Sequence, residues 1–125
     1  MNKEFVPYNE SLELKQLGFD GIYTFKVYDS TTKELIFSEL GNVVSGYILA
    51  PLYQQAFRWF REKYGLDSYI IPARLETKKV YDYYIWFTNE KYERDLFIGM
   101  NNQYTYKEAE LACLKKLIEI VKAKQ

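Results

Sequence analysis

The run from Val80 to Phe87 (VYDYYIWF) consists almost entirely of β-branched and aromatic residues, which favour extended strands. Successive side chains of a strand point to opposite faces of a sheet, so the run divides into two sets. One face would carry Tyr81, Tyr83, Ile85 and Phe87, and the other would carry Asp82, Tyr84, Trp86 and Thr88. We therefore expect the chain to build a β-sheet that contains this strand.

Helical spacing and glycine stop signals predict two helices in the first half of the chain. The segment Ser11–Leu17 is followed by Gly18, a residue type that ends helices in the left-handed conformation. A second helix is expected with Pro51 in its first turn, where proline is tolerated, and Gly65 would end it. Phe60 falls on the apolar stripe of this second helix.

A third helix is predicted at the end of the sequence. Thr105 and Glu108 have the spacing of a capping box, and apolar residues then recur at helical spacing to about Lys122. Tyr53–Ala56 (YQQA) and Tyr106–Ala109 (YKEA) also echo one another, each after a predicted pair of strands. This echo raises the hypothesis of a duplicated ββα unit.

A hairpin is predicted between the first two helices. Ile22–Tyr28 alternates like a half-buried strand, Asp29–Lys33 has the composition of a turn, and Glu34–Ser38 would return as the second strand. Gly41–Gly46 is expected to form a loop.

The remaining strands are predicted around the aromatic run. Asp67–Lys79 is expected to be extended, and Pro72 within it favours an edge strand, a bulge or a break. Asp95–Gly99 would add a further strand, followed by a loop at Asn101–Gln103. The predicted class is α+β, with an antiparallel sheet of four to five strands, three helices and the order α-β-β-α-β-β-(β)-α.

Length and composition indicate a single globular domain over residues 1–125. Apolar residues make up 48% of the chain and charged residues 27%, which are ordinary values for a folded domain. The N-terminal residues contain no apolar signal region, and no apolar run is long enough to span a bilayer. A lone cysteine fits a reducing compartment. We therefore expect a cytoplasmic protein without a membrane partner.

Composition also narrows the range of reactions and ligands that the chain can support. The chain has no histidine, which removes the commonest general base and metal ligand, and it has no phosphate-binding glycine motif. The acidic group Glu90–Asp95 lacks the spacing of a calcium loop, and Cys113 lies among apolar residues that favour packing over reactivity. We expect no cofactor and no metal, and a protein that is not an enzyme. The remaining enzymatic alternative is a histidine-free site assembled by the fold.

The aromatic content of 18%, with thirteen tyrosines, points to a contact surface. If helices cover one face of the sheet, Tyr84 and Trp86 lie on the other, and Tyr28 of the hairpin is expected to extend this aromatic face. Tyrosine and tryptophan are favoured anchors of protein interfaces. Two alternatives remain open: the face binds a partner protein, or the N-terminal helix or a second copy in a homo-oligomer covers it.

The second helix offers a different site. Arg58, Arg61 and Lys63 share its exposed side, and Trp59 lies beside them. Guanidinium groups bind phosphate oxygens, and an indole ring can stack on a base, so this pattern is compatible with binding nucleic acid or a nucleotide. The simpler interpretation is an ion pair between Arg58 and Glu62 at the spacing of one helical turn. A net charge of zero makes nucleic acid the less favoured partner.

Three stretches resemble small proteins encoded by phages and prophages of gut Bacteroidota. These stretches are Phe5–Tyr8 with Leu14–Asp20, Ala50–Leu66, and the C-terminal helix from Tyr106–Ala109 through Lys122. That group has no established activity, so the resemblance implies a context and no site residues. It implies a small accessory protein in a host cytoplasm that modulates host or defence functions. The leading hypothesis is thus a binding protein that acts through protein–protein contacts.

Overall fold

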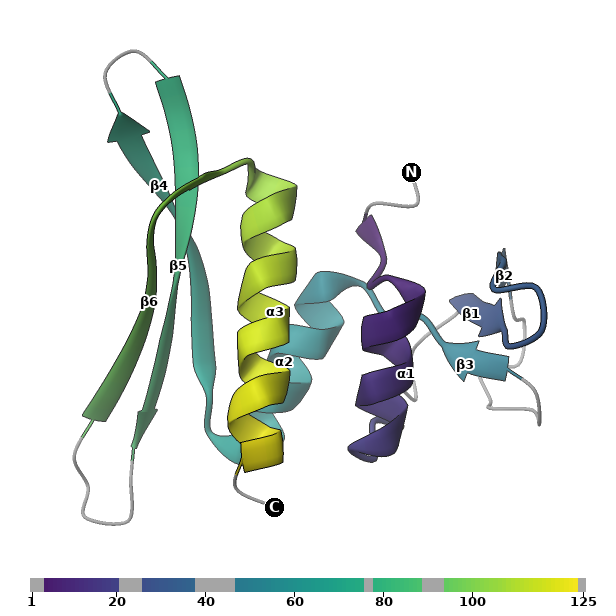
Figure 1. Ribbon diagram of the computed structural model, residues 1–125. Coiled ribbons are helices and arrows are strands. Elements are labelled where there is room, and N and C mark those ends of the chain that lie inside the picture. Colours follow the sequence, from purple (N-terminus) through teal and green to yellow (C-terminus); the bar gives the residue numbers. More distant parts are fainter. Residues whose placement is uncertain (1–3, 21–25, 38–46, 76–77, 89–93, 124–125) are drawn as a thin grey trace. The chain divides into compact units, whose positions relative to one another are not determined.

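The computed structural model describes residues 4–20, 26–37, 47–75, 78–88 and 94–123. The chain divides into two compact units, Met1–Ala56 (unit 1) and Phe57–Gln125 (unit 2), each of which is described by itself. The elements in chain order are α1 (Tyr8–Gln16), β1 (Lys26–Asp29), β2 (Leu35–Phe37), β3 (Tyr47–Leu49), α2 (Tyr53–Tyr64), β4 (Asp67–Leu75), β5 (Lys78–Thr88), β6 (Arg94–Tyr104) and α3 (Tyr106–Ala123) (Figure 1).

Unit 1 contains a three-stranded antiparallel sheet in the order β2-β1-β3. The predicted hairpin is confirmed, with Val27 of β1 opposite Ile36 of β2. Its turn is held by Asp29, whose carboxylate accepts hydrogen bonds from the backbone N–H groups of Thr31 at 2.8 Å and Thr32 at 3.3 Å. The third strand, β3, was not predicted. It has only three residues, too few to display an alternating pattern.

The core of unit 1 forms where α1 packs against β3 beside the central strand β1. Tyr28 of β1 is buried with Ile48 and Ala50. The Tyr28 hydroxyl donates a 2.8 Å hydrogen bond to the carbonyl oxygen of Val6, and its ring meets the ring of Tyr8 edge to face at 5.6 Å. A side chain from the middle of the sheet is thereby tied to the segment that leads into α1.

The glycine stops after α1 and α2 are confirmed. Gly18 has φ of 96°, and Gly65 has φ of 67°. After α1 the backbone N–H of Phe19 donates to the carbonyl of Leu14 at 2.9 Å, and that of Gly18 donates to Lys15 at 3.0 Å. These two hydrogen bonds form a Schellman motif, which satisfies carbonyl groups that a helix end would otherwise leave unpaired.

Both helices begin at different residues from those expected. α1 starts at Tyr8, one turn before the predicted start, because Pro7 accepts the backbone hydrogen bond from Ser11 at 2.8 Å and opens the helix. α2 starts at Tyr53, after Pro51, because the side chain of Gln55 accepts a hydrogen bond from the backbone N–H of Leu52 at 2.8 Å. This side-chain cap satisfies one backbone donor at the start of α2.

Unit 2 contains a second three-stranded antiparallel sheet in the order β4-β5-β6. The aromatic run forms its central strand, β5. Pro72 lies in β4, which is an edge strand, so the prediction of an edge position is confirmed. The pairing of β5 with β6 is irregular between Tyr81 and Tyr83, which pair with Tyr104 and Gly99.

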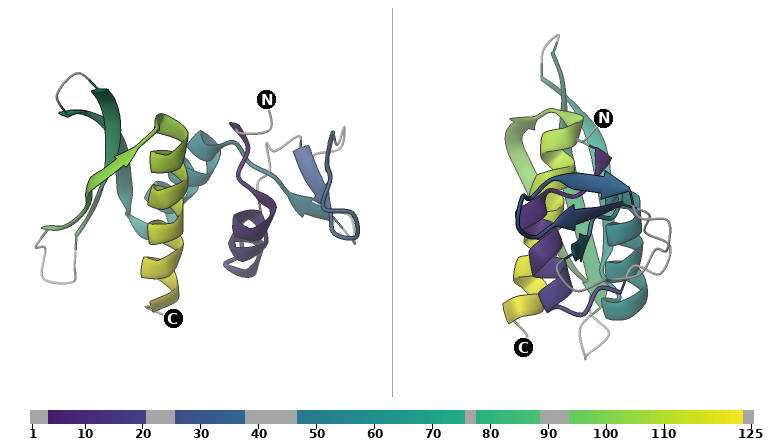
Figure 2. Two further views of the ribbon diagram at one scale, coloured as in Figure 1. Left: turned by 45° about the horizontal axis from the view of Figure 1, so that its top comes forward. Right: turned by 90° about the vertical axis from the view of Figure 1, so that its right-hand side faces the viewer.

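α3 packs along one face of this sheet and contacts all three of its strands (Figures 1 and 2). The predicted capping box is present: Thr105 N–H donates to Glu108 Oε1 at 2.8 Å, and Glu108 N–H donates to Thr105 Oγ1 at 3.2 Å. The buried side chains of unit 2 include Ile85 of β5 and three residues of α3, Cys113, Leu114 and Leu117.

The α+β class and the three helices are confirmed, but the predicted strand arrangement needs correction. The described residues form six strands in two sheets, where four to five strands in one sheet were expected. The loop predicted at Asn101–Gln103 is wrong, because these residues belong to β6 within its irregular stretch opposite β5. The loop expected at Gly41–Gly46 lies outside the described residues.

The structure agrees with one part of the predicted repeat of Tyr53–Ala56 and Tyr106–Ala109 and disagrees with another. Tyr53 and Tyr106 are the first residues of α2 and α3, and in the described chain each helix follows three strands. The strand orders differ, however: the first strand is central in unit 1, whereas the second is central in unit 2. The two halves therefore have different sheet topologies, and duplication of one ββα unit does not describe them.

Candidate partner-binding face

The side of the β4-β5-β6 sheet that faces α3 is identified by side-chain contacts. The rings of Tyr81 and Tyr106 meet edge to face at 5.2 Å, and the thiol of Cys113 on α3 lies close enough to Tyr83 to influence its titration. Burial raises the pKa of Tyr83, and the neighbouring Cys113 adds to that effect. Tyr81, Tyr83 and Ile85 therefore form the inner face, as the alternation of the strand predicted.

The opposite side of the sheet carries the residues that alternate with this inner set. Asp82, Tyr84 and Trp86 of β5 lie there, and the antiparallel register places three residues of β4 beside them. The cross-strand pairs are Ile71 with Asp82, Tyr69 with Tyr84, and Asp67 with Trp86. These six residues are called the outer face below.

The outer face is aromatic and partly open to solvent. Tyr69 keeps 53% of its surface exposed, which makes it the most exposed large apolar residue among those described. Its neighbours Tyr84, Trp86 and Ile71 are half-buried. α3 covers the inner face of the sheet (Figure 1), and the register places these residues on the other side.

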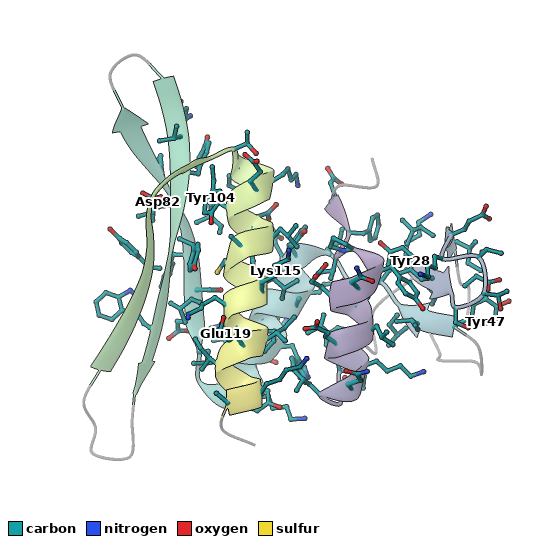
Figure 3. The ribbon with its side chains drawn as sticks, viewed as in Figure 1. Tyr28, Tyr47, Asp82, Tyr104, Lys115 and Glu119 are labelled. Atoms are coloured by element: carbon teal, nitrogen blue, oxygen red, sulfur yellow. The ribbon has the colours of Figure 1, made fainter. Side chains whose placement is uncertain are left out.

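The charged groups of the outer face are acidic. Asp67 and Asp82 are the only ionised side chains among its six residues. One carboxylate oxygen of Asp82, Oδ1, is buried and has no hydrogen-bond partner among the described residues. Figure 3 shows Asp82 on the side of the sheet away from α3, whereas Tyr104 points toward the helix. A half-buried carboxylate thus lies within an aromatic surface.

Tyr28, the third residue expected on this face, lies elsewhere. It belongs to the central strand of the unit 1 sheet, which is a different sheet from that of Tyr84 and Trp86. Only 8% of its surface is exposed, and its hydroxyl is bound to the carbonyl of Val6. Burial, and secondarily the charge of Glu10, raises the pKa of Tyr28. The expectation failed because β1 pairs with β3 and not with the aromatic strand.

The arginine side of α2 is engaged in contacts within the helix. Arg58 Nε lies 2.8 Å from Glu62 Oε1, which confirms the ion pair expected from their spacing. The hydrogen bond from Arg58 lowers the pKa of Glu62. Lys63 Nζ lies 5.0 Å from the centre of the Trp59 ring, at cation–π distance. Arg61 is exposed beside them.

Cys113 has the environment of a packed residue. Its side chain is fully buried against the inner face, and burial raises the pKa of the thiol to about 12. The buried hydroxyl of Ser68 acts in the opposite direction on this pKa, although the two groups do not meet the geometry of a full hydrogen bond. A thiol that stays protonated at neutral pH is a poor nucleophile, as expected from the sequence.

Sequence reasoning did not identify Tyr69 or Asp82 as site residues. Tyr69 is in a segment whose pairing was left open, and only the register with β5 brings it beside Tyr84. Asp82 was assigned to the correct face, but its lack of a hydrogen-bond partner depends on the neighbours that the fold supplies. The signal available in the sequence for Asp82 was its position as an acidic residue inside a run of strand-forming residues.

Within the described residues, no three histidine, cysteine, aspartate or glutamate side chains are grouped closely enough to hold a metal ion. Among the helices of the described chain, none has the length and apolar character needed to cross a bilayer. No family model, curated protein or solved structure matches the chain.

Proposed function

We propose that this chain is a non-enzymatic binding protein whose outer face contacts a partner protein. The observation that supports the proposal most directly is the aromatic surface of Tyr69, Tyr84 and Trp86 on the side of the sheet opposite α3. The most stable protein contacts are centred on tyrosine, tryptophan and arginine side chains that lose their water on binding. Two of these three residue types, tyrosine and tryptophan, account for three of the six residues of the outer face.

The arrangement of polar groups supports the same interpretation. Tyrosine and tryptophan combine a large apolar ring with a polar group, so they are compatible both with water and with a buried interface. Exposed apolar surface bordered by polar side chains is a common feature of binding sites. A β-sheet also holds its side chains in fixed positions, which lowers the entropy lost when a partner binds.

We further propose a setting for this activity. The resemblance to proteins of Bacteroidota phages and prophages suggests an accessory protein that acts in a bacterial cytoplasm and modulates host or defence functions. A homo-oligomer that buries the outer face is the principal alternative to a different partner protein. Nucleic acid or nucleotide binding by α2 remains a separate hypothesis, and the contacts of Arg58 and Lys63 within that helix give it no additional support.

The proposal is tested by affinity capture of the tagged protein from a Bacteroidota lysate, with and without nuclease. We expect a discrete protein to be retained after nuclease treatment and lost with Trp86→Ala or Tyr84→Ala. Trp59→Ala removes the other tryptophan and serves as the matched control, which should retain the partner. Far-UV circular dichroism verifies that each variant is folded. The proposal would be contradicted if both Trp86→Ala and Tyr84→Ala still capture the partner. Salt-sensitive recovery of nucleic acid would instead favour the hypothesis that α2 binds nucleic acid.

A further inference from the structure

The unpaired carboxylate of the outer face indicates the chemistry of the partner. We infer that the partner protein places a cationic side chain, preferably an arginine, against Asp82 between the aromatic rings of this face. The inference rests on the proposed function, because it assumes that the outer face is the contact surface. It adds the class of chemical group that this face recognises.

Asp82 has the position that such recognition needs. It lies on β5, where it pairs with Ile71 of β4 and falls at the irregular point of the pairing between β5 and β6. Its carboxylate is half-buried, and Oδ1 is shielded from solvent without a hydrogen-bond partner among the described residues. A shielded acceptor that lacks a partner is costly, and a charged donor compensates that cost more fully than a neutral one. A cation brought by the partner would approach the solvent-exposed part of Asp82 and offset the charge of its carboxylate.

The aromatic neighbours favour a cation as well. Tyr84 follows Asp82 on the same face of β5, and Tyr69 lies directly across from Tyr84 on β4. Aromatic rings attract cations through their electron-rich faces, and arginine also stacks on them through its planar guanidinium group. The same group carries five N–H donors in a rigid fork, so it can stack on a ring and donate to a carboxylate at the same time, whereas a lysine ammonium does not stack.

Charge complementarity distinguishes this partner from a second copy of the chain. The six residues of the outer face include two acids, Asp67 and Asp82, and no base. Two such sets of six residues stacked on one another would desolvate four carboxylates, and none of the twelve residues would supply a cation. Burial of unpaired charges of one sign is unfavourable, so a basic segment of a different protein fits this face better.

The test uses the full chain with Trp59→Phe, so that Trp86 is its only tryptophan. The probes are two nine-residue peptides of alternating serine and arginine or serine and citrulline, which differ in charge but hardly in shape. We expect the arginine peptide to change Trp86 fluorescence saturably and the citrulline peptide to have no effect. Asp82→Asn, which keeps the shape and removes the charge, should weaken arginine peptide binding about tenfold or more.

The matched control is Asp29→Asn, which neutralises an aspartate in the hairpin turn of unit 1 and should leave the affinity unchanged. No saturable response, an equal response to citrulline, or unchanged binding by Asp82→Asn would overturn the inference. A dimer in sedimentation experiments that Tyr69→Lys dissociates would also overturn it. If the inference fails while Trp86→Ala still abolishes partner capture, the proposed function stands alone. If capture survives both Trp86→Ala and Tyr84→Ala, the proposed function itself fails.

Discussion

Two tyrosines occupy central strands of three-stranded antiparallel sheets, and their surroundings differ. Tyr28 of unit 1 is buried, and its hydroxyl is bound to the carbonyl of Val6. Tyr84 of unit 2 is half-buried on the face opposite α3. Residue type and strand position are the same in both cases. A tyrosine in a sheet therefore becomes part of the core or of a surface according to the element that packs against its face.

The sharpest test of this comparison sets the two faces of β5 against each other. Ile85→Ala removes a fully buried side chain from the inner face, so we expect the free energy of unfolding to fall by about 2–5 kcal/mol. Urea unfolding followed by circular dichroism measures the change. Tyr84→Ala, on the adjacent residue and the opposite face, is the matched control and should cost clearly less. Equal losses would show that the outer face is packed as tightly as the core.

A second experiment sharpens the comparison through the inner face at alkaline pH. The pKa of Cys113 is raised from 9.0 to about 12, so between these values the folded state keeps a proton that the unfolded state has released. Stability from this group is complete below pH 9 and falls as pH rises, with a slope of about 1.4 kcal/mol per pH unit. Urea unfolding at several pH values measures this slope. Cys113→Ala should show a shallower decline, and identical slopes would contradict the assigned burial.

The third prediction compares the two tyrosines directly. Tyr28→Phe removes the hydroxyl bound to Val6, and we expect a loss of roughly 1 kcal/mol in unfolding free energy. The carbonyl of Val6 still accepts a 3.1 Å hydrogen bond from Ser11, which limits the loss. Tyr84→Phe should be close to neutral when both variants are measured in the same urea titration. A larger loss of unfolding free energy for Tyr84→Phe than for Tyr28→Phe would contradict the assignment of Tyr28 to the core and of Tyr84 to the surface.

The smallest effect is expected at the surface of α2. The side chains of Arg58 and Glu62 are 70% and 62% exposed, so their ion pair is strongly screened by solvent. Arg58→Ala should leave the thermal unfolding midpoint unchanged within error. Charge reversal of Arg58 and Arg61 to glutamate tests the nucleic-acid hypothesis in the same background. If the protein binds single-stranded DNA in a salt-sensitive way and this reversal abolishes the binding, α2 would replace the outer face as the candidate site.

The parts of the fold that sequence predicted are those with local causes. The glycine stops depend on positive φ at Gly18 and Gly65, and the capping box depends on hydrogen bonds three residues apart. Strand pairing is set by contacts between distant segments, and here the prediction was less successful. The three residues of β3 carry too little pattern to identify. β6 extends through Asn101–Gln103, which have the composition of a loop and fall where its register with β5 is irregular.

The candidate site divides in the same way. Alternation along β5 was enough to place Tyr84 and Trp86 on one face, since the period of a strand is a local property. The assignment of Tyr28 to that face required knowledge of sheet membership, which no local pattern contains. The contributions of Tyr69 and Asp82 depend on the register of β4 against β5 and on the burial of individual atoms. Such features become visible only when the fold is known.

Pro72 has a consequence for how copies of this protein can join. A sheet that grows into a fibre must add a strand at each of its edges, because every new copy has to offer a free edge to the next. β4 is one edge of the unit 2 sheet, and Pro72 in its middle has no N–H to donate to an incoming strand. A second copy could then add readily only at the other edge, β6. Two copies that pair through β6 leave only their β4 edges free, so association would stop at a dimer and a fibre would not grow.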